Sequence, residues 1–282
     1  MNDLKKAIAT GLGGFKAMTI QVISLMWLRT IMNYQYKYGT SFKETIKKLY
    51  KEGGIKRFYS GIIPALIQGP ISRFGDTFCN AIILNLLKNS KMPIFIKTIF
   101  ASSTAGLVRI IITPIDTFKT MFQVEGKNAM EILKEKITKN GLISLYHGSI
   151  ANGLLTLFGH YPWFVIHNYL NNYIPKFNNN SVKNLIRNAS IGFISSLFSD
   201  TITNSFRVIK TTKQTEKSSK SYYEIGEEII KKNGFKGLFF RGLETRILTN
   251  GIQGLMFNVL WKFFDINKKS KANISIDLKD KN

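Results

Sequence analysis

The chain has 282 residues, a formal net charge of +23 and 44% hydrophobic residues. This length allows either two soluble domains or one membrane bundle, whereas six Pro and a single Cys exclude a disulfide scaffold and a cysteine-built metal site. The excess of positive charge is compatible with nucleic-acid binding, an anionic membrane surface or anionic ligands.

One order of elements occurs three times along the chain. Each third is predicted to contain a long apolar helix, then a basic segment with a short amphipathic helix ending at a glycine, and then a second apolar helix. The long first helices are expected at about 3–33, 93–123 and 182–214, and the short helices at 41–51, 129–140 and 222–233. The second apolar helices begin near Gly61, Gly148 and Gly242.

Several windows are long and apolar enough to be candidate membrane spans. Residues 148–170 and 247–261 contain no Asp, Glu, Lys or Arg, and residues 7–28 contain one charge, Lys16. The mean hydropathy is near zero, as expected if each helix turns a polar stripe towards a water-filled cavity. A soluble all-helical protein remains an alternative on hydropathy alone.

A related motif lies near the end of each long first helix. Its cations are Arg29, Lys119 and Lys210, at steps of 90 and 91 residues. The second copy is complete, with Pro114 and Asp116. The first copy has Ser24 and Met26 in their place, and the third has Ser205 and Arg207. A repeat of this length in three copies predicts a closed threefold object and not an open array.

These motifs resemble the signature of the mitochondrial carrier family, Pro-x-acid-x-x-cation followed by an aromatic–basic–Gly step, over roughly residues 5–265. The resemblance implies an all-α membrane protein with six transmembrane helices in a threefold pseudo-symmetric bundle and three short surface helices. A single carrier domain would comprise three repeats, at about 5–90, 91–177 and 178–265, with a polar tail at 266–282. It also implies a monomer in the mitochondrial inner membrane, or in a plastid-type envelope membrane.

The resemblance further implies two gates. A Pro kinks a helix, and an acid and a cation three residues apart share one helical face, so three such helices can close one end of a cavity. The inner gate would comprise Arg29, Asp116, Lys119, Arg207 and Lys210, with Asp116 meeting Lys210. With one carboxylate against four cations, this gate is either closed mainly by packing and hydrogen bonds or is a cationic floor for an anionic substrate. The outer gate would comprise Asn80, Asn168, Asn171, Lys262 and Asp265, and is expected to be weak.

Candidate substrate-binding residues follow from the family's spacing and from charges within apolar helices. They are Gln68, Arg73, Arg109, Leu155, Thr156, His160, Asp200, Thr249 and Asn250. A structural Arg109–Asp200 ion pair between helices is the alternative for those two residues. Arg246 is expected to have a packing role.

Other candidate sites are weaker. Helix starts bind anions through free N–H groups, and Gly54, Gly61, Gly141, Gly148, Gly234 and Gly242 resemble the family's cardiolipin sites, although helix capping also explains them. His147, His160 and His167 lack a nearby carboxylate for a metal site, and Cys79 is expected to be a buried small residue. No enzyme motif is present, so neither catalysis nor a cofactor is expected.

The charge distribution predicts the orientation. The loops at 29–57, 119–147 and 207–241 contain 22 Lys and Arg, and the opposite side contains 14. The positive-inside tendency therefore places these loops inward.

The sequence thus favours a carrier that moves a small metabolite, either an organic anion or a nucleotide-like compound, by alternating access. One alternative is a degenerate carrier that acts as a membrane adaptor, which the incomplete gates suggest. The other is a soluble basic nucleic-acid binder, which salt alone would extract.

Overall fold

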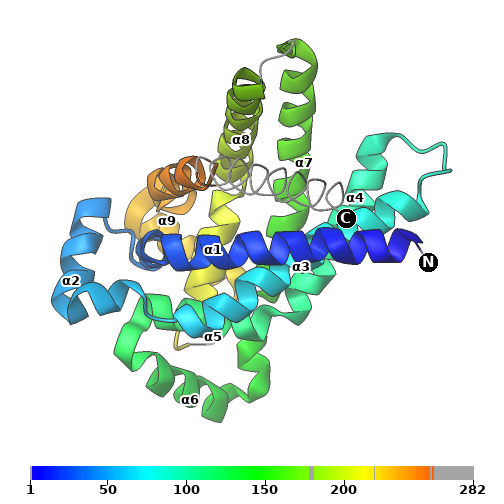
Figure 1. The fold of residues 1–282 in the computed structure, drawn as a ribbon. Helices are drawn as coiled ribbons and strands as arrows, with labels where there is room; N and C mark the ends of the chain where they lie inside the picture. The colour runs from blue at the N-terminus through cyan, green and yellow to red at the C-terminus, as the bar shows by residue number, and fades with distance from the viewer. Residues whose placement is uncertain (1, 178–180, 219, 255, 257–282) are drawn as a thin grey trace, which may run out of the picture.

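The computed structural model describes residues 2–177, 181–218, 220–254 and 256, and every regular element in these ranges is a helix (Figure 1). The α-helices are α1 (Asn2–Tyr38), α2 (Phe42–Phe58), α3 (Ile62–Leu86), α4 (Ile94–Ile111), α5 (Thr113–Glu125), α6 (Ala129–Asn140), α7 (Ser149–Tyr173), α8 (Ser181–Thr215) and α9 (Tyr222–Phe239). Two 3-10 turns, η1 (Gly126–Asn128) and η2 (Leu142–Tyr146), flank α6, and residues 243–254 are helical. The all-helical class is therefore confirmed.

The short helices begin at local sequence signals. Ser41 caps α2 and Ser221 caps α9, and in each case the carboxylate of a Glu three residues later accepts a hydrogen bond from the N–H of the cap residue. This reciprocal arrangement satisfies two backbone N–H groups that would otherwise lack partners. Both helices continue beyond their predicted ends to residues 58 and 239, but with non-helical backbone at Gly53, Gly54 and Gly234.

The second long helix is broken, in contrast to the continuous helix expected over 93–123. It is divided at Ile112 into α4 and α5, and Pro114 lies in the first turn of α5. Proline lacks the N–H that would continue the hydrogen-bond ladder and clashes with the preceding turn. Ser24 and Ser205 occupy the corresponding positions in α1 and α8, and both of those helices are continuous.

By length and composition, no single helix in the described ranges is long and apolar enough to span a membrane. The pair Ile96–Ile111 and Thr113–Asn140, bent by 65° at its break, passes the same test together.

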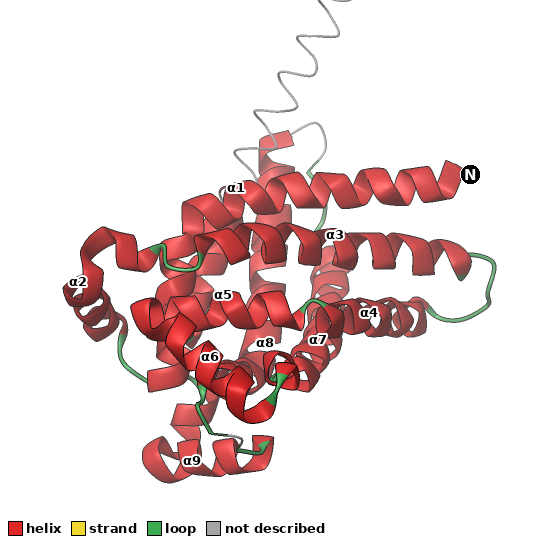
Figure 2. Cartoon of the chain, turned by 90° about the horizontal axis from the view of Figure 1, so that it is seen from below, coloured by secondary structure: helices red, strands yellow, loops and turns green. Residues whose placement is uncertain are grey.

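Neighbouring long helices pack in chain order. The most extensive contacts join α1 to α3, α3 to α4, α4 to α7 and α7 to α8. Figure 2 shows α1, α3 and α5 side by side. The segment 243–254 returns to α1 and α8, because Thr245 donates to the Gln35 side chain at 2.5 Å and Asn250 donates to Asp200. The contacts therefore form a closed circuit.

The C-terminal ends of α1, α5 and α8 converge. Lys37 forms an ion pair with Glu216 at 2.7 Å, and Tyr38 donates to Glu125 at 2.9 Å. The opposite ends of α1 and α8 point in different directions in Figure 1, where α1 runs across the view and α8 runs upward. The helices thus meet at one end and spread at the other.

A cation from the preceding third, counted cyclically, caps each converging helix end. Arg57 donates to the carbonyls of Gln123 and Val124 in α5, at 2.9 and 2.7 Å. Lys136 of α6 donates to the Gln214 carbonyl of α8 at 2.7 Å. Arg241 donates to the Lys37 carbonyl of α1 at 3.2 Å. These carbonyls have no partner within their own helix, so the caps hold the three ends in a fixed cyclic order.

Burial lowers the pKa of one of these capping residues. The Lys136 residue is 1% exposed, and desolvation, followed by repulsion from Lys37 and Lys213, lowers its pKa to about 8. Its ammonium group is therefore held among carbonyls at an electrostatic cost.

Three glycines also allow the backbone to pass close to these same helices, again in the same cyclic order. A Cβ at Gly61 would lie 3.0 Å from the Lys119 carbonyl, and one at Gly148 would lie 3.3 Å from the Lys210 carbonyl. One at Gly242 would lie 2.9 Å from the Tyr36 ring. All three have positive φ, where side chains are disfavoured.

The Arg57 cap predicts a specific loss of stability. Replacement Arg57→Gln removes charge-assisted hydrogen bonds from a residue that is 5% exposed, and we expect a loss of about 3 kcal/mol in unfolding free energy. Thermal unfolding of the detergent-solubilised protein measures this loss. Lys56→Gln, at the exposed neighbouring residue, is the matched control and should leave the melting temperature unchanged; equal effects of the two variants would contradict the capping role.

Candidate functional site

Asp116 lies at the centre of a buried ion network between α5 and α8. Asp116 is 0% exposed. Its carboxylate accepts hydrogen bonds from Lys119 Nζ at 2.5 Å and from Lys210 Nζ at 2.7 Å. The ion pair expected between Asp116 and Lys210 is therefore formed. Lys119 adds a second cation to the same carboxylate, which the sequence analysis did not anticipate.

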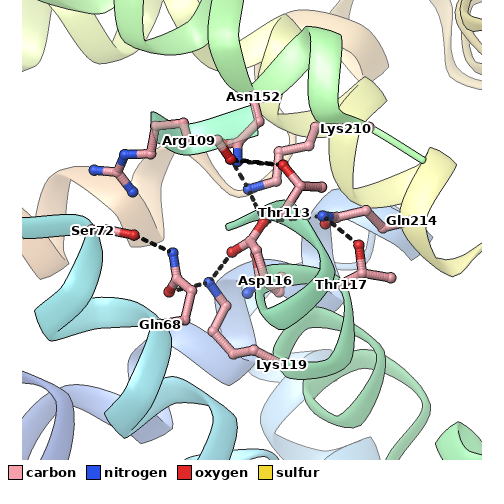
Figure 3. A network of polar contacts seen from close by, with 12 residues as sticks. Gln68, Ser72, Arg109, Thr113, Asp116, Thr117, Lys119, Asn152, Lys210 and Gln214 are labelled. Carbon is pink, nitrogen blue, oxygen red and sulfur yellow. Dashed lines mark hydrogen bonds and ion pairs between the residues drawn. The ribbon is translucent and has the colours of Figure 1, made fainter. Parts of the chain in front are cut away.

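Amide side chains complete this network (Figure 3). Gln214 Nε2 donates to Asp116 Oδ2 at 3.0 Å and to Thr117 Oγ1 at 3.2 Å. Lys119 also donates to Gln68 Oε1 at 3.1 Å, and Lys210 to Asn152 Oδ1 at 3.4 Å. The network thus joins α3, α5, α7 and α8. Because a buried charge is stable only with paired partners, separating α5 from α8 requires new partners for the separated groups.

A second ion cluster surrounds Asp200 on α8. Arg207 Nη2 and Arg246 Nε donate to Asp200 Oδ1 at 2.8 and 3.2 Å, and Asn250 donates to Oδ2. The sequence placed Arg207 in the inner gate, but its guanidinium reaches back two helical turns to Asp200. Arg246, for which packing was expected, is an ion-pair partner.

The alternative Arg109–Asp200 ion pair is wrong. Arg109 of α4 pairs with Asp76 of α3, with Nη2 2.5 Å from Oδ2 and Nε 3.2 Å from Oδ1. The physical reason is the helix order, since α7 packs against both α4 and α8 and lies between them. His160 of α7 lies near this pair and shares a 3.0 Å hydrogen bond with Ser102.

The remaining predicted substrate residues are dispersed. Gln68 is buried and donates to Ser72 at 3.0 Å, and Thr156 and Thr249 are buried with hydroxyls bonded to their own helices. Leu155 is partly buried and Arg73 is exposed. The structure therefore brings Gln68 to the Asp116 network and Asn250 to Asp200, whereas Thr156 and Thr249 make only local bonds.

Arg29 stands apart from its predicted partners. Its hydrogen bonds within the described residues amount to one 4.0 Å contact from Nη2 to the Met18 sulfur. Its Nε is buried without a hydrogen-bond partner. A buried N–H that lacks an acceptor is costly, so Arg29 is an unsatisfied donor beside the ion network.

The amides expected at the outer gate do not bond to one another. Asn171 of α7 accepts from Arg187 of α8 at 2.8 Å, within one helical hairpin. The described residues give neither Asn80 nor Asn168 a hydrogen bond. Lys262 and Asp265 lie outside the described residues.

The glycine, histidine and cysteine candidates have local roles. The Gly148 N–H donates to the Tyr222 hydroxyl at 3.1 Å, and Gly54, Gly141 and Gly234 have open space at the Cβ position. His167 stacks on Trp163 with ring centroids 4.6 Å apart. Cys79 is a buried free cysteine. No group of three metal-ligating side chains occurs in the part of the chain that the structure describes.

Sequence reasoning missed several members of these networks. Gln123 and Gln214 each lie four residues after the motif cation, as does Asn33. Asn33 donates to Gln123 at 2.5 Å, and Gln123 contacts the Met26 sulfur at 3.4 Å. This repeated spacing is a signal that could have identified them. Asp76 is an acid in an apolar helix, which could also have been flagged.

Comparison with known proteins gives a family match over nearly the whole chain. A family model described as mitochondrial carrier protein matches residues 3–91, 92–178 and 181–266. A mitochondrial glutathione transporter of Bos taurus is 27% identical over 239 residues, which cover 76% of this chain and 68% of that protein. A probable chloroplastic envelope ADP,ATP carrier of Arabidopsis thaliana is 29% identical, covering 53% of this chain and 40% of that protein. A mitochondrial thiamine pyrophosphate carrier of Saccharomyces cerevisiae is 25% identical, with 62% and 60% covered.

The ion network predicts the effect of removing its carboxylate. Asp116→Asn leaves Lys119 and Lys210 without a counterion in a buried site, and we expect a loss of about 3 kcal/mol in unfolding free energy. Thermal unfolding checks this value. Glu135→Gln, which breaks the exposed pair with Lys139, is the control and should have little effect. An unchanged melting temperature in Asp116→Asn would show that packing alone holds α5 and α8 together.

Proposed function

The chain belongs to the mitochondrial carrier family, and we propose that it moves a small anionic metabolite across the mitochondrial inner membrane by alternating access. The observation that carries this proposal is the buried Asp116 network, which joins α5 and α8 at the end where the long helices converge. Such a network can be broken and re-formed as the two helices separate. Binding of a substrate would offset the lost contacts and shift the protein between two conformations.

The proposed architecture is a single domain of three repeats with six spanning helices and approximate threefold symmetry. The cyclic order of the Arg57, Lys136 and Arg241 caps supports it. Large apolar side chains that are more than half exposed occur on α3, α4, α7 and α8, and they support a lipid environment for these helices. They include Ile63 and Leu86 of α3, Leu107 and Ile111 of α4, Tyr169 and Tyr173 of α7, and Ile186 and Ile202 of α8.

The arrangement of the helices supports one direction of opening. The ion network and the caps lie at the converging end, and the basic loops that the positive-inside tendency places inward are at the same end. The helices spread at the opposite end (Figure 1). We therefore assign this conformation to a state that is closed on the inner side and open outward. This agrees with the absence of hydrogen bonds from Asn80 and Asn168 to other described residues.

The charges support an anionic substrate. The Asp116 and Asp200 clusters each contain more cations than carboxylates, and Arg29 has no carboxylate partner in the described residues. Two of the similar proteins named above are carriers of ADP and ATP and of thiamine pyrophosphate, which are anions. The Asp76–Arg109 pair, with His160 and Gln68, is the proposed second part of the binding site.

Anionic lipid is the proposed partner at the surface helices. Gly54, Gly141 and Gly234 adopt the same backbone conformation next to open space, and such φ and ψ values are almost restricted to glycine. A cardiolipin headgroup could approach the backbone there. At Gly148 the N–H group is already bonded to Tyr222, so a lipid would have to use neighbouring groups.

Uptake into proteoliposomes separates transport from an adaptor role. We expect the reconstituted protein to take up at least one anion from a panel of phosphorylated and carboxylated metabolites. The adaptor alternative is motivated by Arg207 in the acid position of the third motif. Uptake of no compound, by protein that is folded and correctly inserted, would favour the adaptor.

A double-mutant cycle tests the role of Arg109. Arg109→Gln should reduce uptake more than tenfold, but so would any variant that leaves the partly buried Asp76 unpaired. In the double variant Asp76→Asn/Arg109→Gln both charges are removed. If Arg109 binds substrate, uptake stays low while the melting temperature recovers; if the pair is only structural, uptake and melting temperature recover together.

A further inference from the structure

Three cations from different thirds of the chain lie close together beside the Asp116 network. The last helical segment packs against α1 within a turn of Arg29, since a Cβ at Gly242 would lie 3.3 Å from the Met32 carbonyl and Thr245 bonds to Gln35. Arg246 follows Gly242 by one helical turn and repels Arg29 electrostatically, as Arg29 in turn repels Lys119 on α5. Lys119 has Asp116 as its counterion, and Arg246 has Asp200. Arg29 has no counterion among the described residues.

The Arg29 guanidinium has vacant donors as well as an unbalanced charge. Its Nε is buried without an acceptor, and its Nη2 has only the long contact to the Met18 sulfur. Arg246 uses its Nε for Asp200, and no hydrogen bond of its Nη groups to the described residues is present. Two guanidinium groups with free N–H donors therefore lie near each other, and such groups match the oxygens of carboxylates and phosphates.

The balance of charge selects between these anions. Arg29, Lys119, Arg207, Lys210 and Arg246 carry five positive charges, whereas Asp116 and Asp200 carry two negative charges, which leaves an excess of three. A monocarboxylate would neutralise one of these charges, and a dicarboxylate carries its two charges on separate groups. A phosphoryl group carries about −2 at neutral pH, and it also offers oxygens to both guanidinium groups.

We propose that Arg29 and Arg246 bind a phosphoryl group, and that the metabolite carried by this protein is an organic phosphate. The identification of the ligand as a transported metabolite rests on the proposed carrier function. The anion site itself does not depend on that function. The bound group would connect α1 to the last helical segment, next to the place where Asp116 connects α5 to α8. The substrate would thus supply the negative charge that the first and third motifs lack.

Thermal unfolding of the detergent-solubilised protein tests the site without transport. Sodium phosphate and glycerol 2-phosphate should each raise the melting temperature, and sodium acetate at matched ionic strength should not. A response to glycerol 2-phosphate identifies an organic phosphate as a ligand, whereas a response to inorganic phosphate alone identifies the free ion and overturns the assignment of the metabolite. A response to neither phosphate overturns the site.

Variants of Arg29 locate the site. Arg29→Gln should raise the half-stabilising phosphate concentration about tenfold or more, because charge-assisted hydrogen bonds are lost. Lys139→Gln, at an exposed cation whose side chain is 64% exposed, should respond as the wild type does. A wild-type response in Arg29→Gln would overturn the proposal.

Two variants of Met18 test the site without removing Arg29, so that a loss of the phosphate response can be distinguished from misfolding. The Met18 sulfur lies 4.0 Å from Arg29 Nη2, so Met18→Glu would supply Arg29 with a counterion of similar length. We expect Met18→Glu to raise the melting temperature in the absence of phosphate and to lose the phosphate response. Met18→Gln, of the same shape but neutral, should keep the response; retention of the full response in Met18→Glu would contradict the site.

The outcome for transport is separate. A protein that responds to phosphate but takes up no metabolite would remove the carrier function and leave the anion site in place. A protein that transports a carboxylate and ignores phosphate would leave the carrier function and remove this inference.

Discussion

A single buried carboxylate organises the converging end of this bundle. Asp116 accepts from Lys119 on its own helix, from Lys210 on α8 and from Gln214 on α8. A carboxylate that is 0% exposed has to be fully compensated by such donors, because an isolated charge is very costly to bury. The positions of α5 and α8 are therefore linked to the ionic state of one side chain.

Around this centre, the ends of the long helices are also held by contacts to the backbone, in addition to the Lys37–Glu216 ion pair. Arg57, Lys136 and Arg241 bond to backbone carbonyls, and Gly61, Gly148 and Gly242 allow the chain to approach the same helices. Backbone carbonyls are present whatever the side chain. These contacts can therefore recur in all three thirds although the ionic motif is complete in only one of them.

The ionic contacts, in contrast, depend on side chains and therefore differ between the thirds. The acid position of the motif contains Met26, Asp116 and Arg207 in turn. Met26 is buried against Gln123, and Arg207 turns back to Asp200, an acid seven residues earlier on α8. This leaves Arg29 without a counterion among the described residues, and the described part of the bundle has an excess of positive charge on the side of α1 and the last helical segment.

The sequence by itself determined the helical class and the order of elements, and the resemblance to the carrier family implied the pairing of Asp116 with Lys210. A kink at Pro114 was expected from its missing N–H group, whereas the full break at Ile112 was not. The expected features depend on local signals, such as apolar periodicity, a missing N–H group and an acid and a cation on neighbouring repeated motifs. Only the tertiary structure decided that Arg109 pairs with Asp76 and Arg207 with Asp200. Long charged side chains choose among several carboxylates according to which helices lie between them, and spacing along the chain does not contain that information.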